Sequence, residues 1–290
     1  MCIRDRVSSG FDLLRDRKSL AIQTGIPDLD QLVRGGFQTG FTYEVFGLPG
    51  VGKTQLALTL ASQCLQSSMR QSNVVYLDTK NDFRIERLVE ILRERQSNSS
   101  GDGDSSSSSS KSETLKKSLL QKLRVKKDFY LSDILKSLSS IVNSIEACSK
   151  QQQQSSRKRR RSSDPPSEPH AQDPFWSRIR LVILDNIGSL VLPELGEDSK
   201  NLNEVCGIVA QIKILLKHLV TRFNICALVI NTATSRTMEG ACGRQVYYKP
   251  SLGKIFEDAA DVKIYVEKNE KQNELSNLSR TVRILSLIHI

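Results

Sequence analysis

The chain has 290 residues, of which 38% are hydrophobic and 6% aromatic, and it carries a formal net charge of +10. No uncharged apolar run approaches the roughly 18 residues of a membrane span, and the six cysteines form no C-x-x-C pair, so the composition disfavours a membrane protein and a disulfide or zinc framework. The excess charge lies in residues 111–161, with 14 Lys/Arg and 4 Asp/Glu; since the remainder is neutral, net charge does not identify the folded part as a nucleic-acid binder.

Residues 1–6 and 285–290 are predicted to be adaptor-derived ends rather than natural protein sequence. Residues 1–6 back-translate to ATG TGT ATA AGA GAC AGN, and residues 285–290 to CTG TCT CTT ATA CAC ATC, the reverse complement of the first string. One inverted sequence at both ends is typical of read-through from a transposon-type adaptor, so fold reasoning leaves both ends out. The alternative, two genuine termini, stays open. Residues 7–40 are expected to form an N-terminal linker and the entry to the core.

Alternating strand and helix patterns fill residues 41–95, the first part of the predicted core. A short apolar strand is expected at 42–46, a helix at 53–67, a second strand at 73–78 and a second helix at about 83–95. Strands and helices in series favour a parallel sheet with helices on both faces, whose ligands lie at the carboxyl ends of the strands.

The turn between the first strand and the first helix matches the phosphate-binding pattern G-x-x-x-x-G-K-[ST] without exception. Glycines allow the backbone N–H groups of such a P-loop to turn toward phosphate oxygens, and the following helix adds the positive end of its dipole. Lys53 is expected to bridge the β- and γ-phosphates, and the Thr54 hydroxyl to ligate magnesium. The sequence therefore predicts a site for ATP and Mg²⁺ formed by Gly47, Leu48, Pro49, Gly50, Val51, Gly52, Lys53 and Thr54.

Residues 96–127 and 149–175 are predicted to be disordered, with one helix of the core between them. Residues 96–110 are nearly all Ser with Gly, Asp and Asn, and such a composition buries too little apolar area to offset the ordering entropy. Apolar residues at helical spacing from Leu131 to Ile145 predict an amphipathic helix within the core segment 128–148. The second linker holds a glutamine tract, four prolines and the basic run 157–161, for which a nuclear import signal is favoured over a nonspecific nucleic-acid contact or a solvated linker.

Residues 176–284 are expected to complete the core. A buried strand at 181–185 precedes a helix at about 202–220, and strands follow at 225–231, 261–267 and 281–284. Asp185 ends the first of these strands, where an acidic residue near a P-loop is expected to hold magnesium together with Thr54. An aspartate after four aliphatic residues is common, so a strand-end cap is the alternative. The predicted fold class is α/β, with a mostly parallel sheet, helices on both faces and a disordered Ser-rich and basic insertion.

Several of these segments resemble the RecA-like recombinases of eukaryotes and their DNA-repair paralogues, the Rad fifty-one group. The resemblance is carried by residues 24–30 (Thr-Gly-Ile-Pro-Asp-Leu-Asp), the P-loop, residues 76–79 (Tyr-Leu-Asp-Thr) and residues 249–253 (Lys-Pro-Ser-Leu-Gly). Residues 11–40 and 249–253 are most similar to the D paralogues. The resemblance implies a RecA-like P-loop NTPase core with ATP and Mg²⁺ as ligands. It also implies that the partners are other recombinase paralogues and single-stranded or branched DNA, and that the protein is located in the nucleus.

Two positions depart from the pattern of the active recombinases in this family. Lys80 occupies the position of the glutamate that activates the attacking water, and a cationic side chain does not accept that proton unless its pKa is strongly depressed. Thr232 stands where a glutamine senses the γ-phosphate, and threonine is too short for that reach. No catalytic residue is therefore assigned and slow hydrolysis is expected, with Asp82 or Glu86 as a less favoured substitute base.

Residues 189–201 and 235–248 correspond to the two loops that contact DNA in the family. The first is acidic here, with three carboxylates against Lys200, which makes it a poor partner for phosphates. Cationic and aromatic side chains in and beside the second offer contacts to the DNA backbone and stacking on bases, and solvated loop charge is the alternative. The candidate DNA-binding residues are Arg236, Arg244, Tyr247, Tyr248 and Lys249.

Together these features favour an ATP-binding assembly or mediator subunit that acts in double-strand-break repair by homologous recombination and hydrolyses ATP weakly. One alternative is a self-sufficient, DNA-dependent ATPase that exchanges strands, against which Lys80 and Thr232 argue. Another is a RecA-like motor or signalling ATPase outside repair, which only the family resemblance disfavours.

Overall fold

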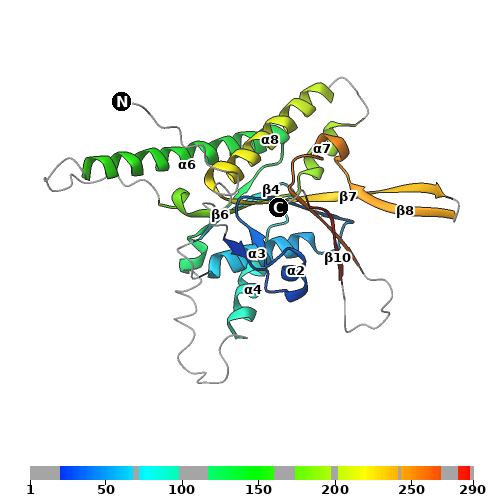
Figure 1. Ribbon diagram of the computed structural model, residues 1–290, viewed down its shortest axis with the longest axis horizontal. Helices are drawn as coiled ribbons and strands as arrows, with labels where there is room; N and C mark the ends of the chain where they lie inside the picture. Colours follow the sequence, from blue (N-terminus) through cyan, green and yellow to red (C-terminus); the bar gives the residue numbers. More distant parts are fainter. Residues whose placement is uncertain are drawn as a thin grey trace, which may run out of the picture.

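The computed structural model describes residues 20–67, 72–97, 117–159, 174–196, 202–240, 243–268 and 280–287. These residues form an α/β core in which helices cover both faces of one eight-stranded sheet (Figure 1). The strands lie in the order β10-β9-β3-β7-β6-β4-β5, and β8 pairs with β7 beside this path. Their bounds are β3 Thr42–Gly47, β4 Asn73–Asp78, β5 Leu123–Lys127, β6 Ile179–Asp185, β7 Cys226–Gly240, β8 Gly243–Pro250, β9 Val262–Lys268 and β10 Arg280–Leu287.

Neighbouring strands from β9 to β5 all pair in parallel, and within the described part of the eight-stranded sheet antiparallel pairing occurs only where β10 meets β9 and β8 meets β7. Every residue of β3 and of β4 is buried. Such continuous burial is expected of parallel strands that helices cover on both faces, and it explains why these strands contain unbroken apolar runs. The predicted fold class is confirmed.

Two hydrophobic clusters join the helices to the two faces of the sheet. One contains buried residues of α3 (Lys53–Gln66) and α4 (Ile85–Ser97), and the other contains buried residues of α6 (Leu131–Arg159) and α8 (Leu202–Phe223). Figure 1 shows α6 and α8 on one side of the sheet and α3 and α4 on the other. The predicted helices therefore exist, with ends that differ from the predicted ones by a few residues.

Helix α6 differs most from its predicted length. Its buried residues repeat at helical spacing, as predicted, and the helix then continues through residues 149–159, which were assigned to a disordered linker. The prediction was wrong for these residues because Gln, Lys and Arg have favourable helix propensities and extend a helix already fixed by its apolar face. Residues 160 and 161 of the basic run lie outside the described residues.

Strand β5 lies inside the predicted insertion 96–127, so the predicted boundary was also wrong there. It pairs in parallel with β4, whose backbone groups would otherwise face no strand on that side. The Arg124 guanidinium lies 4.2 Å from the ring centroid of Phe175 and 4.5 Å from that of Trp176, contacts that tie β5 to the segment before β6. Lysines at exposed positions are common at the edge of a sheet. They also make the strand similar in composition to the polar residues before it, so the sequence did not predict it.

Strand β7 serves two structures. Its first part lies between β3 and β6 at the centre of the sheet, and its second part, from Ala233 to Gly240, pairs with β8 in an antiparallel hairpin. The hairpin projects away from the core in Figure 1. The strand predicted at 225–231 is confirmed, but the loop predicted at 235–248 is wrong, because threonine, valine and tyrosine there favour paired strands.

The chain enters the core through a small unit made of β1 (Ala21–Ile22), α2 (Pro27–Leu32) and β2 (Phe37–Gln38), in which β1 and β2 pair antiparallel. Strand β10 includes residues 285–287 of the end that was predicted to be adaptor-derived, and residues 1–6 lie outside the described residues. None of the helices that the structure describes has the length and apolar character needed to cross a membrane.

Candidate functional site

The P-loop lies between β3 and α3 at the carboxyl end of the parallel sheet. Gly50 and Gly52 have φ values of 77° and 99°, a left-handed conformation that other residues rarely adopt. A Cβ atom at Gly47 would lie 2.2 Å from the carbonyl oxygen of Val266, so a side chain does not fit there. No side chain caps the N-terminus of α3. Its first N–H groups are therefore available to an anion.

Lys53 is buried, with 8% of its surface exposed, and its Nζ atom donates to the carbonyl oxygens of Gly47 (2.9 Å) and Leu48 (2.8 Å). Burial is the main reason that its pKa falls to about 8; Asp185 opposes this shift and the charge of Lys80 adds to it. A buried ammonium group with carbonyl partners gains from an anionic ligand. The loop thus presents one cation and a set of N–H groups in one place.

Asp185 ends β6 and receives two hydrogen bonds on the same carboxylate oxygen. Thr54 Oγ1 donates to Oδ2 over 2.8 Å, and the Tyr76 hydroxyl donates to it over 2.7 Å. Burial is the largest cause of the raised pKa of Asp185, and the two hydrogen bonds oppose it. The structure therefore brings together the two residues predicted to hold magnesium, and adds Tyr76.

Sequence reasoning used Tyr76 for the family resemblance but did not assign it to the site, although a hydroxyl in a strand that precedes the one ending at Asp185 was a usable signal. Register places Tyr76 opposite Ile183, two residues before the pair Asp78 and Asp185. Burial, followed by the neighbouring charge of Asp185, raises the pKa of this phenol well above its ordinary value, so it remains a hydrogen-bond donor. Tyr76 can therefore hold the carboxylate in one orientation.

Lys80 follows β4 in a turn that Asp78 organises. The Asp78 carboxylate is 1% exposed and accepts backbone N–H bonds from Lys80, Asp82 and Phe83 at 3.0 to 3.2 Å. The neighbouring Thr79 donates its N–H to the carbonyl oxygen of Asp185 over 2.8 Å. Lys80 itself is exposed, at the carboxyl end of the sheet where the P-loop also lies. It therefore places an ammonium group, and not a carboxylate, at this position.

The end of β7 carries a buried polar network beside the P-loop. Glu44 in β3 is 1% exposed and accepts a hydrogen bond from Asn231 Nδ2 over 2.7 Å. Asn231 Oδ1 accepts from Ser251 Oγ and from the N–H of Thr232, and Thr232 Oγ1 donates to Ser251 Oγ, each over 2.8 Å. Thr232 thus bonds to the base of β8 rather than extending toward the P-loop. A carboxylate inside the apolar run of β3 was the missed signal for Glu44.

The candidate DNA-binding residues divide between the two faces of the hairpin. Arg236 pairs in register with Tyr247, and Lys249 Nζ lies 5.2 Å from the Tyr247 ring centroid. Tyr248 instead stacks on Tyr265 of β9, with ring centroids 5.8 Å apart, and so packs against the core. Arg244 pairs in register with Glu239, and its side chain lies outside the described part.

The other predicted DNA loop, residues 189–201, is partly helical. Helix α7 (Gly188–Glu194) begins this segment, and Ser189 Oγ donates to the carbonyl oxygen of Asn186. Residues 197–201, which include most of its charged side chains, lie outside the described residues. The assignment of this segment to DNA stays a prediction.

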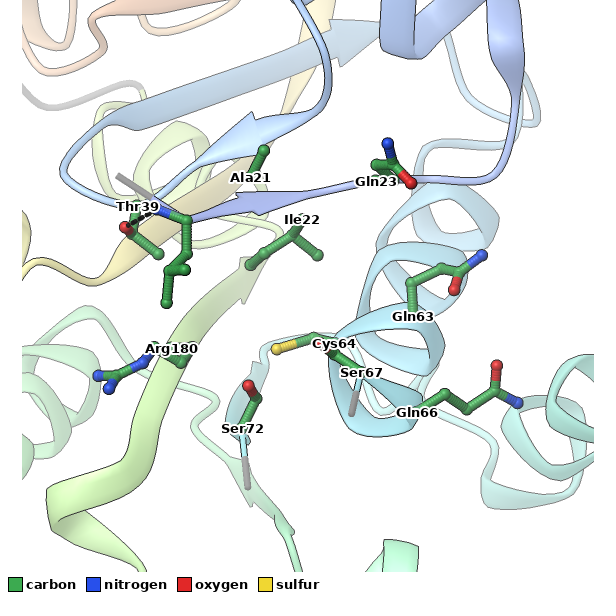
Figure 2. Close-up of a pocket in the computed structure, with 11 residues that line it drawn as sticks. Ala21, Ile22, Gln23, Thr39, Gln63, Cys64, Gln66, Ser67, Ser72 and Arg180 are labelled. Atoms are coloured by element: carbon green, nitrogen blue, oxygen red, sulfur yellow. Dashed lines mark hydrogen bonds between the residues drawn. The ribbon is translucent and has the colours of Figure 1, made fainter. Parts of the chain in front are cut away.

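A separate cavity of about 640 Å³ lies at the amino end of the sheet (Figure 2). Its walls come from β1, from the last turn of α3 and from Ser72 and Arg180, which precede or begin strands β4 and β6. Figure 2 shows Cys64 and Ile22 on its lining. Because the P-loop is at the opposite ends of the strands, this cavity takes no part in the nucleotide site.

The set of metal ligands fits magnesium. Among the described residues, no group of three or more His, Cys, Asp or Glu side chains could hold a metal ion by itself. Magnesium in nucleotide sites commonly binds one or two protein oxygens together with phosphate oxygens and water. The adjacent Asp185 carboxylate and Thr54 hydroxyl supply such a pair.

Comparison with known proteins agrees with this geometry. Residues 15–122 match the family model described as Rad51. "DNA repair protein RAD51 homolog 4" of Mus musculus is 26% identical over 280 residues, which cover 94% of this chain and 69% of that protein. "Probable DNA repair protein RAD51 homolog 4" of Dictyostelium discoideum is 27% identical over 274 residues, 90% of this chain and 69% of that protein. A "Meiotic recombination protein DMC1 homolog" of Glycine max is 46% identical over 87 residues, 29% of this chain and 25% of that protein. The resemblance to the D paralogues, predicted from residues 11–40 and 249–253, is confirmed.

Proposed function

Because this chain carries a Rad51-family domain with a RecA-like core, we propose that it is an ATP-binding subunit that helps to assemble a DNA-repair complex in homologous recombination. The observation that carries the proposal is a complete phosphate cradle with Lys80 at the position of the water-activating glutamate. Such a site binds nucleotide without the base that would hydrolyse it quickly. ATP then stabilises an assembled state, and turnover is secondary.

The phosphates and the magnesium ion of Mg·ATP each have a matching group in the chain. The N–H groups of residues 47–54 and the Lys53 ammonium would hold the phosphates, and Asp185 with Thr54 would hold Mg²⁺. When bound, Mg·ATP would supply a polyphosphate whose negative charge the Lys53 ammonium and the backbone N–H groups offset. Tyr76 orients the Asp185 carboxylate through its hydrogen bond. Lys53 donates to carbonyl oxygens of the loop, and a phosphate can replace them as its partner.

The partners we propose are other RecA-like recombinase paralogues and single-stranded or branched DNA in the nucleus. The exposed side chains of Arg236 and Lys249 and the ring of Tyr247 share one face of the hairpin, which suits contact with a DNA backbone and stacking on a base. The basic run 157–161 supports nuclear import.

The proposal is tested by measuring ATP turnover at saturating Mg·ATP, with and without single-stranded DNA, for the natural chain and for Lys80→Glu. We expect slow turnover in the natural chain and a rise of at least about 10-fold in Lys80→Glu, since a positioned general base contributes about 10²- to 10⁴-fold. Lys53→Ala is the control that should bind no nucleotide. Fast, DNA-stimulated turnover in the natural chain would support the self-sufficient recombinase instead.

A pull-down from nuclear extract tests the assembly role. Recovery of RecA-like paralogues that depends on Mg·ATP and is lost in Lys53→Ala supports the proposal. Recovery of a lone monomer under both conditions contradicts it.

A further inference from the structure

Two lysines other than Lys53 lie at the mouth of the P-loop. The first is Lys268, the last residue of β9, which runs parallel to β3 and pairs Tyr265 with Phe46. Its Nζ atom lies 3.9 Å from the point that a Cβ atom at Gly50 would occupy. The carbonyl oxygen of Val266, also in β9, lies so close to Gly47 that a Cβ atom there would be 2.2 Å from it. The end of β9 therefore places an exposed ammonium group directly over the glycine turn.

The second is Lys80, at the end of β4. Its backbone is held in place, because its own N–H donates to the Asp78 carboxylate. The preceding Thr79 donates its N–H to the carbonyl oxygen of Asp185 in β6, and its hydroxyl hydrogen-bonds to that of Ser189 in α7. Register places Asp78 opposite Asp185, the candidate magnesium residue. Asp185 in turn accepts a hydrogen bond from Thr54 of the P-loop. Lys80, two residues after Asp78 and exposed, therefore lies at the same edge of the sheet as the loop.

The charges around this space favour a ligand with more negative charge. Lys53, Lys80 and Lys268 contribute three cations, whereas the Asp78 carboxylate is occupied by three backbone N–H groups and Asp185 by Thr54 and Tyr76. Asp82 in the same turn and Glu86 in the first turn of α4 are exposed carboxylates, so the three lysines outnumber them. Neighbouring cations repel one another until an anion binds between them, and the gain grows with the charge of that anion.

We propose that Lys80 and Lys268 are phosphate-binding residues that flank the P-loop and make the site select a nucleoside triphosphate over the diphosphate. This inference rests on the proposed function, since it adds ligands to the same nucleotide site. It also gives Lys80 a positive role: the residue that replaces a general base holds the terminal phosphate. The site is thereby built to retain ATP.

The test compares two probes, magnesium adenylyl imidodiphosphate and Mg·ADP, in competition with a fluorescent nucleotide on the full chain. We expect the natural chain to bind the triphosphate analogue at least about 10-fold more tightly than the diphosphate, as one additional charge-assisted contact would give. Lys80→Met and Lys268→Met should each reduce that ratio by about 3- to 10-fold. The double variant should bring the two affinities close together.

Lys254→Met is the matched control, because Lys254 is an exposed lysine in η3 (Gly253–Ile255), outside the cradle. It should leave the ratio unchanged, and thermal unfolding without nucleotide should confirm that all variants are folded. Equal losses of both affinities in Lys80→Met and Lys268→Met, or no losses, would overturn the proposed selectivity while leaving nucleotide binding in place. Failure of the natural chain to bind either probe would instead refute the nucleotide site itself, and this inference with it.

Discussion

The nucleotide cradle and the β7–β8 hairpin are held in place in different ways, although β7 contributes to both. At the base of the hairpin, Asn231 is fully buried and its amide bonds to Glu44, Thr232 and Ser251. Five residues further along the strand, Arg236 is exposed and fixed only through the backbone ladder with Tyr247. The strands behind the cradle are therefore joined by side-chain hydrogen bonds, whereas the outer face of the hairpin is held by its backbone ladder and leaves the Arg236 side chain exposed.

The largest effect should follow from breaking the buried network at the point where the two regions meet. Asn231→Leu removes the described hydrogen bond to Glu44, whose other carboxylate oxygen, Oε2, already lacks a partner. An unpaired buried carboxyl group costs several times more than its hydrogen bond contributes, so we expect a loss of about 2–4 kcal/mol in the free energy of unfolding. Urea denaturation measures it.

A double variant separates this explanation from general damage to the core. Glu44→Leu with Asn231→Leu replaces both partners by apolar groups, so part of the lost stability should return. If the loss in the free energy of unfolding of the double variant exceeds the sum of the losses of the two single variants, the account based on an unpaired carboxyl group is wrong.

An effect of intermediate size is expected inside the cradle. Tyr76→Phe removes the 2.7 Å hydrogen bond to Asp185 and leaves the aromatic ring in contact with Phe83. The Mg²⁺ concentration needed for half-maximal nucleotide binding should rise about 10-fold, the usual cost of losing an outer-shell partner of a metal ligand. Tyr130→Phe is the control, since Tyr130 is 67% exposed. A rise in Mg²⁺ requirement shared by both variants would argue against a positioning role for Tyr76.

A smaller effect should depend on pH. Burial raises the pKa of Glu44 above its ordinary value of 4.5, so the folded state holds this proton more firmly than the unfolded state. The stabilisation is therefore complete below pH 4.5 and is lost as the pH rises through the folded-state pKa. Glu44→Gln should remove this dependence and gain stability relative to the natural chain as the pH rises, measured by unfolding from pH 4.5 to pH 8. Parallel curves for the two proteins would contradict it.

The contrast between the two regions also explains what the sequence could predict. The P-loop is a contiguous run whose glycines and lysine all act within eight residues, and β4 was predicted with the bounds Asn73–Asp78 that the structure has. Apolar spacing predicted the buried face of α6 for the same reason: helical periodicity is a local property. Elements whose evidence is local were therefore predicted well.

The residues that were missed depend on pairing between distant segments. Tyr76 and Asp185 are 109 residues apart and meet only because β4 lies beside β6, and Glu44 meets Asn231 across 187 residues. The hairpin was predicted as a loop because its pairing depends on the register of residues 233–240 with residues 243–250. Strand β5 was not predicted, because the lysines that an edge strand of a sheet tolerates gave it the same polar composition as the insertion before it.

The smallest effect separates the two faces of the hairpin. Tyr247→Ala and Arg236→Ala should each weaken binding to single-stranded DNA by about 3-fold or more, with Arg236→Ala also reducing the salt dependence by roughly one counterion. Tyr248→Ala should leave DNA affinity nearly unchanged and lower stability instead, because its ring stacks on Tyr265 of β9 rather than facing outward. Fluorescence anisotropy at several salt concentrations and thermal unfolding of the same samples measure both quantities. If Tyr248→Ala weakens DNA binding as much as Tyr247→Ala does, both faces of the hairpin contact DNA, and the contrast between a packed face and a binding face does not hold.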